Sequence, residues 1–199
     1  MFPLVREAVA AVLPVECLRH VGFSHFEADE CGSLNEFLAV APVAAPLCGR
    51  IAAMVSVDDV ADRPARALAD GERLVLGRHT VRWLDTPHVP HAWECGLLFE
   101  ETTRTLLCGD LFTQPGASHP PVTSGDILGP SEAMRSGLDY WAHAASTRPT
   151  LERLASLQPT TLACMHGSAW TRDGAGLIRE LAAKLEVGES QTFFGPALT

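Results

Sequence analysis

His25-Phe-Glu27-Ala-Asp29-Glu30 places three metal-binding side chains at alternating positions, with a fourth beside them. In an extended segment, alternate side chains point to the same side, so the first three can converge on one site. Imidazole and carboxylate groups ligate divalent metals, and a mixture of the two limits which metals fit. The stretch therefore predicts a metal centre built where a strand ends.

Three further metal-binding residues follow at wide intervals. His91 ends the sequence Thr-Pro-His-Val-Pro-His, whereas Asp110 and His166 each come shortly after an apolar run, 105–108 and 160–164. In layered α/β folds, the functional site commonly lies at the strand ends, so a polar residue that follows a buried strand is a candidate for that site. Singly, each of these residues is more often a turn or structural residue. One cluster followed by His, Asp and His predicts a two-metal site assembled from distant parts of a sheet.

Length and composition narrow the class of protein. The chain has 199 residues, 47% of them hydrophobic and 20% charged, which is typical of a soluble globular protein with one domain over residues 1–199. The net charge of -9 argues against nucleic acid and anionic membrane surfaces as partners. No apolar run reaches 18 residues and no signal peptide is recognisable, so a cytoplasmic location is expected.

The six cysteines show no CxxC pair and are expected to be free thiols in a reducing compartment. Cys108 and Cys164 each lie two residues before a proposed metal ligand. We expect both to be small buried residues near the site, with metal ligation or redox sensing as the alternatives.

Hydrophobic periodicity and turn residues divide the chain into mixed helices and strands. Helices are expected over 3–12, 34–40, 131–144, 147–157 and 174–186. Strands are expected over 17–24, 73–76, 79–84, 96–99, 105–108 and 160–164. The segment 45–60 is expected to hold a short strand and a helix, and 114–130 a long loop. This pattern predicts a layered α/β domain.

The order of the candidate ligands resembles the metallo-β-lactamase superfamily. Hydrolases of that superfamily carry H-x-H-x-D-H followed by a distant His, Asp and His. Glu27 stands where they have the second His, and this resembles the flavodiiron branch of oxygen and nitric oxide reductases and their oxygen-binding relatives. The eighteen residues between His91 and Asp110 also resemble that branch. The resemblance covers about residues 15 to 186.

The resemblance implies an αββα sandwich with a metal pair at one sheet edge. It assigns His25, Glu27 and His91 to the first metal and Asp29 and His166 to the second, with Asp110 bridging both. It also makes Asp29 and Asp110 the catalytic candidates. A thiolate-free site rich in oxygen ligands favours two iron ions, with zinc or manganese as alternatives.

Two features differ from the pattern of that family. Glu30 stands where the family has a second His, so Glu30 is a candidate ligand for the second metal. The alternatives are that Glu30 points away or that His88 replaces it. The cluster begins at residue 25, so we expect either a truncated start or a reduced first sheet, whose exposed edge homodimerisation would cover.

Three functions remain open at this level. The first is a diiron protein that binds or reduces O2 or NO, as an enzyme or a sensor, with a separate electron donor because no flavin site is recognisable. The second is a metal-dependent hydrolase of an ester, thioester or phosphodiester. Glu27 counts against hydrolysis, because an added negative charge makes the metals poorer Lewis acids. The third is a non-catalytic module that has lost its second metal.

Overall fold

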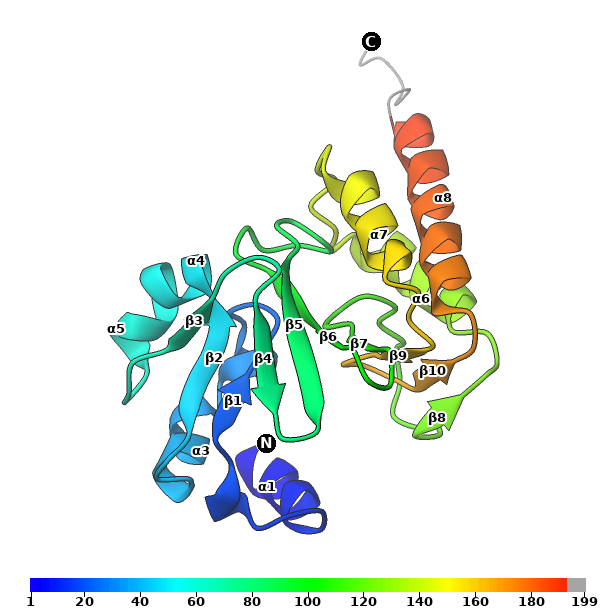
Figure 1. Cartoon of the computed structure of the whole chain (residues 1–199). Coiled ribbons are helices and arrows are strands. Elements are labelled where there is room, and N and C mark those ends of the chain that lie inside the picture. Colours follow the sequence, from blue (N-terminus) through cyan, green and yellow to red (C-terminus); the bar gives the residue numbers. More distant parts are fainter. Residues whose placement is uncertain (193–199) are drawn as a thin grey trace.

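The computed structural model describes the backbone of residues 1–192 and the side chains of residues 1–185. It contains a three-stranded sheet in the first third of the chain and a seven-stranded sheet in the rest. Figure 1 shows the two sheets between two groups of helices. That residues 1–199 form one domain stays a prediction, because residues 193–199 lie outside the described part.

The small sheet is parallel and has the order β1-β2-β3. Its strands are β1 (His20–Gly22), β2 (Ala45–Gly49) and β3 (Arg66–Leu68). Around it lie α1 (Phe2–Ala10), η1 (Val15–Cys17), α2 (Ala28–Cys31), α3 (Leu34–Val40), α4 (Arg50–Ala52), η2 (Ala53–Val57) and α5 (Asp58–Val60). Leu38, Cys48 and Val57 are fully buried between this sheet and its helices. The first sheet thus contains three strands within residues 1–192.

The large sheet has the order β4-β5-β6-β7-β9-β10-β8. Its strands are β4 (Arg73–Leu76), β5 (His79–Asp85), β6 (Gly96–Glu100), β7 (Thr105–Leu107), β8 (Val122–Thr123), β9 (Thr161–Ala163) and β10 (Ala169–Thr171). Strands β4 to β7 form antiparallel hairpins, and β7 then pairs with β9 in parallel. The end of β7 and the end of β9 consequently lie side by side, which brings the segments after them together.

Helices cover the outer face of the large sheet. They are α6 (Leu128–Leu138), α7 (Thr147–Ser156) and α8 (Gly174–Thr192). Leu106, Leu162 and Ile178 are fully buried between this face and the helices. The expected αββα layering is therefore confirmed, with the polar segments left at the edge of the sandwich.

Trp83 joins the two sheets. Its buried ring packs with Leu47 and Leu68 of the small sheet, and its indole N–H donates to Asp85 Oδ1 at 2.7 Å. A Cβ atom on Gly96 would lie 2.1 Å from the Trp83 ring, so only glycine fits on the neighbouring strand. This close approach is a reason for glycine at the start of β6.

Most predicted elements are present with shifted ends, but three strands were missed. β3, β8 and β10 contain two or three residues each, too few for a period of two to be visible. The predicted strand 17–24 forms only at His20–Gly22.

The predicted helix over 131–144 is wrong at both ends. α6 begins at Leu128 and stops at Leu138, because Asp139 takes a left-handed conformation with φ 43°. Such a residue ends a helix, and Asp tolerates the conformation better than most side chains. Tyr140 therefore lies in a loop after α6 and not on a packed helix.

No helix within residues 1–192 has the length and apolar character needed to span a bilayer. All six cysteines are free thiols, as the sequence predicts.

Candidate metal centre

Six of the predicted site residues meet where segments from both sheets end. His25 lies after β1, Glu27 precedes α2, and Asp29 is in the first turn of α2. His91 lies in the loop between β5 and β6, while Asp110 and His166 follow the adjacent strands β7 and β9. The fold therefore joins positions separated by up to 141 residues, 25 to 166.

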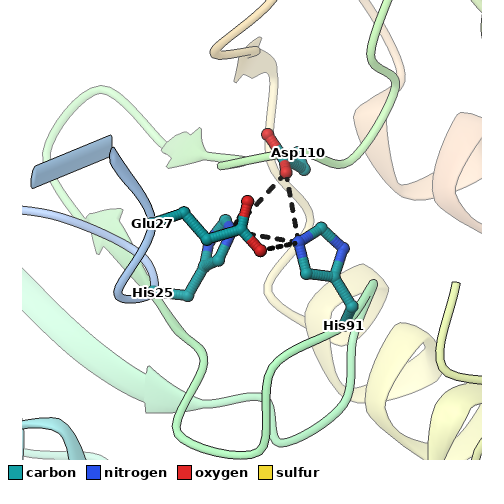
Figure 2. A group of neighbouring side chains, drawn as sticks. All are labelled: His25, Glu27, His91 and Asp110. Carbon is teal, nitrogen blue, oxygen red and sulfur yellow. Dashed lines mark hydrogen bonds and ion pairs between the residues drawn. The ribbon is translucent and has the colours of Figure 1, made fainter. Parts of the chain in front are cut away.

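The first group contains His25, Glu27, His91 and Asp110, which Figure 2 shows pointing toward one centre. The two imidazole Nε2 atoms lie 3.0 Å apart. His91 Nε2 lies 3.1 Å from Glu27 Oε1 and 3.5 Å from Asp110 Oδ2, and His25 Nε2 lies 3.6 Å from that same Oδ2. Atoms that are each about 2.1 Å from one metal are about 3.0–3.4 Å apart, so these spacings fit a coordination shell.

The second group contains Asp29, His166 and Asp110. His166 Nε2 lies 3.3 Å from Asp29 Oδ2 and 3.3 Å from Asp110 Oδ1. Asp110 thus directs one carboxylate oxygen to each group. A carboxylate placed in this way can bridge two metal ions.

His25 is oriented by the residue before it. Ser24 Oγ lies 2.8 Å from His25 Nδ1, and the imidazole is only 1% exposed. When Nδ1–H donates to this hydroxyl, Nε2 keeps its lone pair for a metal. Such partners fix the tautomer and ring orientation of a ligand histidine.

Glu94 is a supporting residue that sequence reasoning missed. It is buried, and its Oε1 accepts the backbone N–H of Phe26 at 3.0 Å. Phe26 lies between His25 and Glu27, so this bond holds the segment that carries two candidate ligands. A signal existed in the sequence, because a carboxylate directly before a buried strand needs a partner.

Tyr140 is a second residue that was missed. Its ring meets His91 edge-on, with centroids 6.0 Å apart, and it lines the cavity at the site. Burial raises the pKa of Tyr140, so its hydroxyl stays protonated at neutral pH. The expectation of a helix through residue 144 concealed this position.

Glu30 and His88 are not among the side chains that meet in either group. Glu30 Oε2 accepts the backbone N–H of Ser24 at 3.2 Å, and burial raises the pKa of the Glu30 carboxyl. Glu30 lines a different cavity, between the two sheets, and His88 is exposed. The candidate ligands of the second group are therefore Asp29, His166 and Asp110, with His166 in contact with both carboxylates.

A cavity of about 530 Å³ opens over the two groups. Its floor holds the candidate ligands, and its walls combine Met134, Leu138 and Met165 with the polar Thr113 and Gln114. Apolar walls around a few polar groups are typical of a small-molecule site.

No family model matches the chain, and no curated protein matches it in sequence. Solved structures do resemble it. Rubredoxin oxygen:oxidoreductase from Desulfovibrio gigas gives a TM-score of 0.73 at 19% identity over 89% of this chain and 46% of its own. The apo chemotaxis sensor ODP from T. denticola gives 0.74 at 17% identity over 90% of this chain and 75% of its own. The flavodiiron protein from Giardia intestinalis gives 0.71 at 19% identity over 92% and 46%.

The chain has the metallo-β-lactamase-like fold of flavodiiron cores. This confirms the fold that the resemblance implied. The chain spans about half the length of the oxidoreductase and the Giardia protein and about three quarters of the sensor. The likeness concerns the fold.

Proposed function

We propose that this protein holds two iron ions and binds or reduces O2 or NO between them. The observation that carries the proposal is Asp110, whose two carboxylate oxygens each face one group of candidate ligands. The similar structures include proteins named as an oxygen oxidoreductase, a flavodiiron protein and a chemotaxis sensor. Bound iron would supply the electron transfer that carboxylates and imidazoles cannot perform themselves.

In this proposal His25, Glu27, His91 and Asp110 hold the first iron, and Asp29, His166 and Asp110 hold the second. Seven ligand contacts from imidazole and carboxylate, without a thiolate, suit iron or manganese more than a structural zinc site. We do not assign Glu30 to the second iron, because its Oε2 is bonded to the Ser24 amide. Glu30 instead helps to position Ser24, and through it His25.

The cavity walls and Tyr140 would act on the bound ligand. Met134, Leu138 and Met165 form the apolar part of the cavity wall. The Tyr140 ring lies beside His91 with its protonated hydroxyl buried, and Asp29 borders the same cavity. These residues give the cavity mixed apolar and polar walls of a size that admits a small ligand.

Electrons in this proposal come from a separate donor, and two copies of the chain associate. β1 is an edge strand of the small sheet, and an unpaired edge is commonly covered by another chain. Analytical ultracentrifugation of the purified protein tests the homodimer, which a single monomeric species would contradict.

A hydrolase is the second candidate, and one observation favours it. The cavity of about 530 Å³ is far larger than a diatomic ligand requires. In a hydrolase, Asp29 would orient a water molecule toward a small ester, thioester or phosphodiester. Ester or phosphodiester hydrolysis that disappears in Asp29→Ala would favour this candidate.

The deciding experiment is metal analysis with an absorption spectrum. The protein is produced in iron-rich medium, purified anaerobically and then exposed to air, with Asp110→Ala in parallel. Two irons per chain and a new near-ultraviolet oxo-ferric band support the proposal, provided that Asp110→Ala shows neither. Two zincs and no spectral change would favour the hydrolase, and one metal or none would favour a non-catalytic module.

A further inference from the structure

Cys108 and Cys164 occupy opposed positions on adjacent strands. β7 and β9 run in parallel with Leu107 opposite Ala163, so the next position on each strand is a cysteine. The Cys108 amide donates to the carbonyl of Ala163 at 2.9 Å, and the Met165 amide donates to Gly109 at 3.1 Å. Backbone hydrogen bonds thus hold the two chains together on both sides of the cysteine pair.

The two thiols lie on the same face of the sheet. Leu106 and Leu162, two residues earlier, are paired and fully buried under the helices, and both cysteines pack against that same core. Adjacent strands are about 4.8 Å apart, within the 4.4–6.8 Å between Cα atoms that a disulfide spans.

The two cysteines differ in accessibility. Cys108 is fully buried, whereas Cys164 is partly exposed at the margin of the same core. A small oxidant can therefore reach Cys164 first. Cys108 then supplies the adjacent thiol that reacts with the oxidised Cys164 to form a disulfide.

We propose that Cys108 and Cys164 form a redox-active dithiol that a hydroperoxide converts to an intramolecular disulfide. The Cys164 thiolate attacks the peroxide oxygen, the O–O bond breaks, and an alcohol or water leaves as the sulfenic acid forms. The Cys108 sulfur then displaces water and forms the S–S bond. The two thiols lose two electrons and two protons, and one hydroperoxide is reduced to alcohol, or water, plus water.

The disulfide would connect the two segments that carry Asp110 and His166. Each cysteine lies two residues before one of these side chains. A covalent bond there limits how far the two segments can separate, and metal release requires them to separate. The oxidised protein should therefore lose bound metal more slowly. This consequence rests on the proposed ligands, whereas the disulfide itself does not.

The first test treats the metal-free full chain with hydrogen peroxide and maps its tryptic peptides without reduction. We expect a Cys108–Cys164 cross-link that dithiothreitol reverses, that persists in Cys17→Ser and that is absent from Cys164→Ser. Cys17 is the matched control because it is exposed and distant along the chain. If Cys164→Ser does not fold, Cys108→Ala gives the same readout. Oxidation without this cross-link, or cross-links through other cysteines instead, would overturn the proposal.

The second test measures release of zinc to a chelator from reduced and peroxide-treated protein. Zinc is redox-inert, so oxidation alters only the protein, and the result does not depend on iron chemistry. We expect release to be at least about threefold slower after oxidation, and unchanged in Cys164→Ser. Equal zinc-release rates in a fully cross-linked sample would overturn the coupling between the disulfide and the metal centre. The iron proposal would not be affected, because the absorption spectrum tests it separately.

Discussion

The two halves of the metal centre differ in burial. In the first group the His25 side chain is 1% exposed and His91 19%. In the second group His166 is 37% exposed and Asp29 53%. Both halves border the cavity, and each has one half-exposed carboxylate, Glu27 or Asp29, but the histidines of the first half are buried more deeply than His166. We infer that the first half fixes its metal tightly and that the second leaves room for an exogenous ligand.

The supports of the two halves differ as well. Side chains hold the first half, since Ser24 orients His25 and Glu94 holds the Phe26 amide. Backbone bonds shape the second half, where the Gln114 amide N–H donates to the His166 carbonyl at 3.1 Å. A side-chain support can be removed by one substitution, so this contrast can be tested.

The largest expected effect follows from removing Asp110, which both halves share. Asp110→Ala should weaken binding of both metals by about 100-fold or more, because each loses a ligand oxygen and a negative charge. Isothermal titration with Fe(II) or Mn(II) under anaerobic conditions measures both affinities. Asp126→Ala, at an exposed loop aspartate, is the control and should retain two equivalents. Retention of one tight metal would show that the two halves are independent.

A matched pair of substitutions separates the halves. Asp29→Ala should reduce the stoichiometry from two metals to one, with the remaining ion held in the buried half. Glu27→Ala should weaken the tight site by about tenfold to 100-fold, since it removes a ligand that contacts His91. Metal analysis after gel filtration distinguishes the two variants. If Asp29→Ala lost the tightly bound ion, the proposed order of affinities would be reversed.

Removing Glu94 tests the support of the first half alone, because Glu94 is not itself a proposed ligand. Glu94→Ala should weaken only the first site, by about tenfold, because the Phe26 amide loses its acceptor and the ligand segment loosens. Glu94→Gln keeps an acceptor oxygen and is the control. Competition with a coloured chelator gives both affinities. An equal loss at both sites would mean that Glu94 acts on the whole fold.

The smallest expected effect comes from the hydroxyl of Ser24. Ser24→Ala should weaken the first site by a few-fold, since the imidazole of His25 stays packed but loses the bond that selects its tautomer. Metal affinity measured at several pH values checks this, with Ser33→Ala as a control. An unchanged affinity would show that packing alone orients His25.

Local patterns predicted much of this molecule. The helix 34–40 and the hairpins around Gly77 and residues 101–104 form as expected, because turn residues and apolar alternation act over a few positions. The ligand positions were also visible, since polar residues after apolar runs mark strand ends. The short strands β3, β8 and β10 were not visible, because their pairing partners stabilise them.

The amino-acid sequence alone shows which residues can bind metal and which predicted strand each of them follows. Only the tertiary structure decided how they are used: Asp110 divides its two oxygens between the groups, and Glu30 turns to the Ser24 amide. It also decided that Glu94, Tyr140 and the opposed cysteines lie at the site. These contacts join residues far apart along the chain, so they depend on how two sheets pack, which no local pattern encodes.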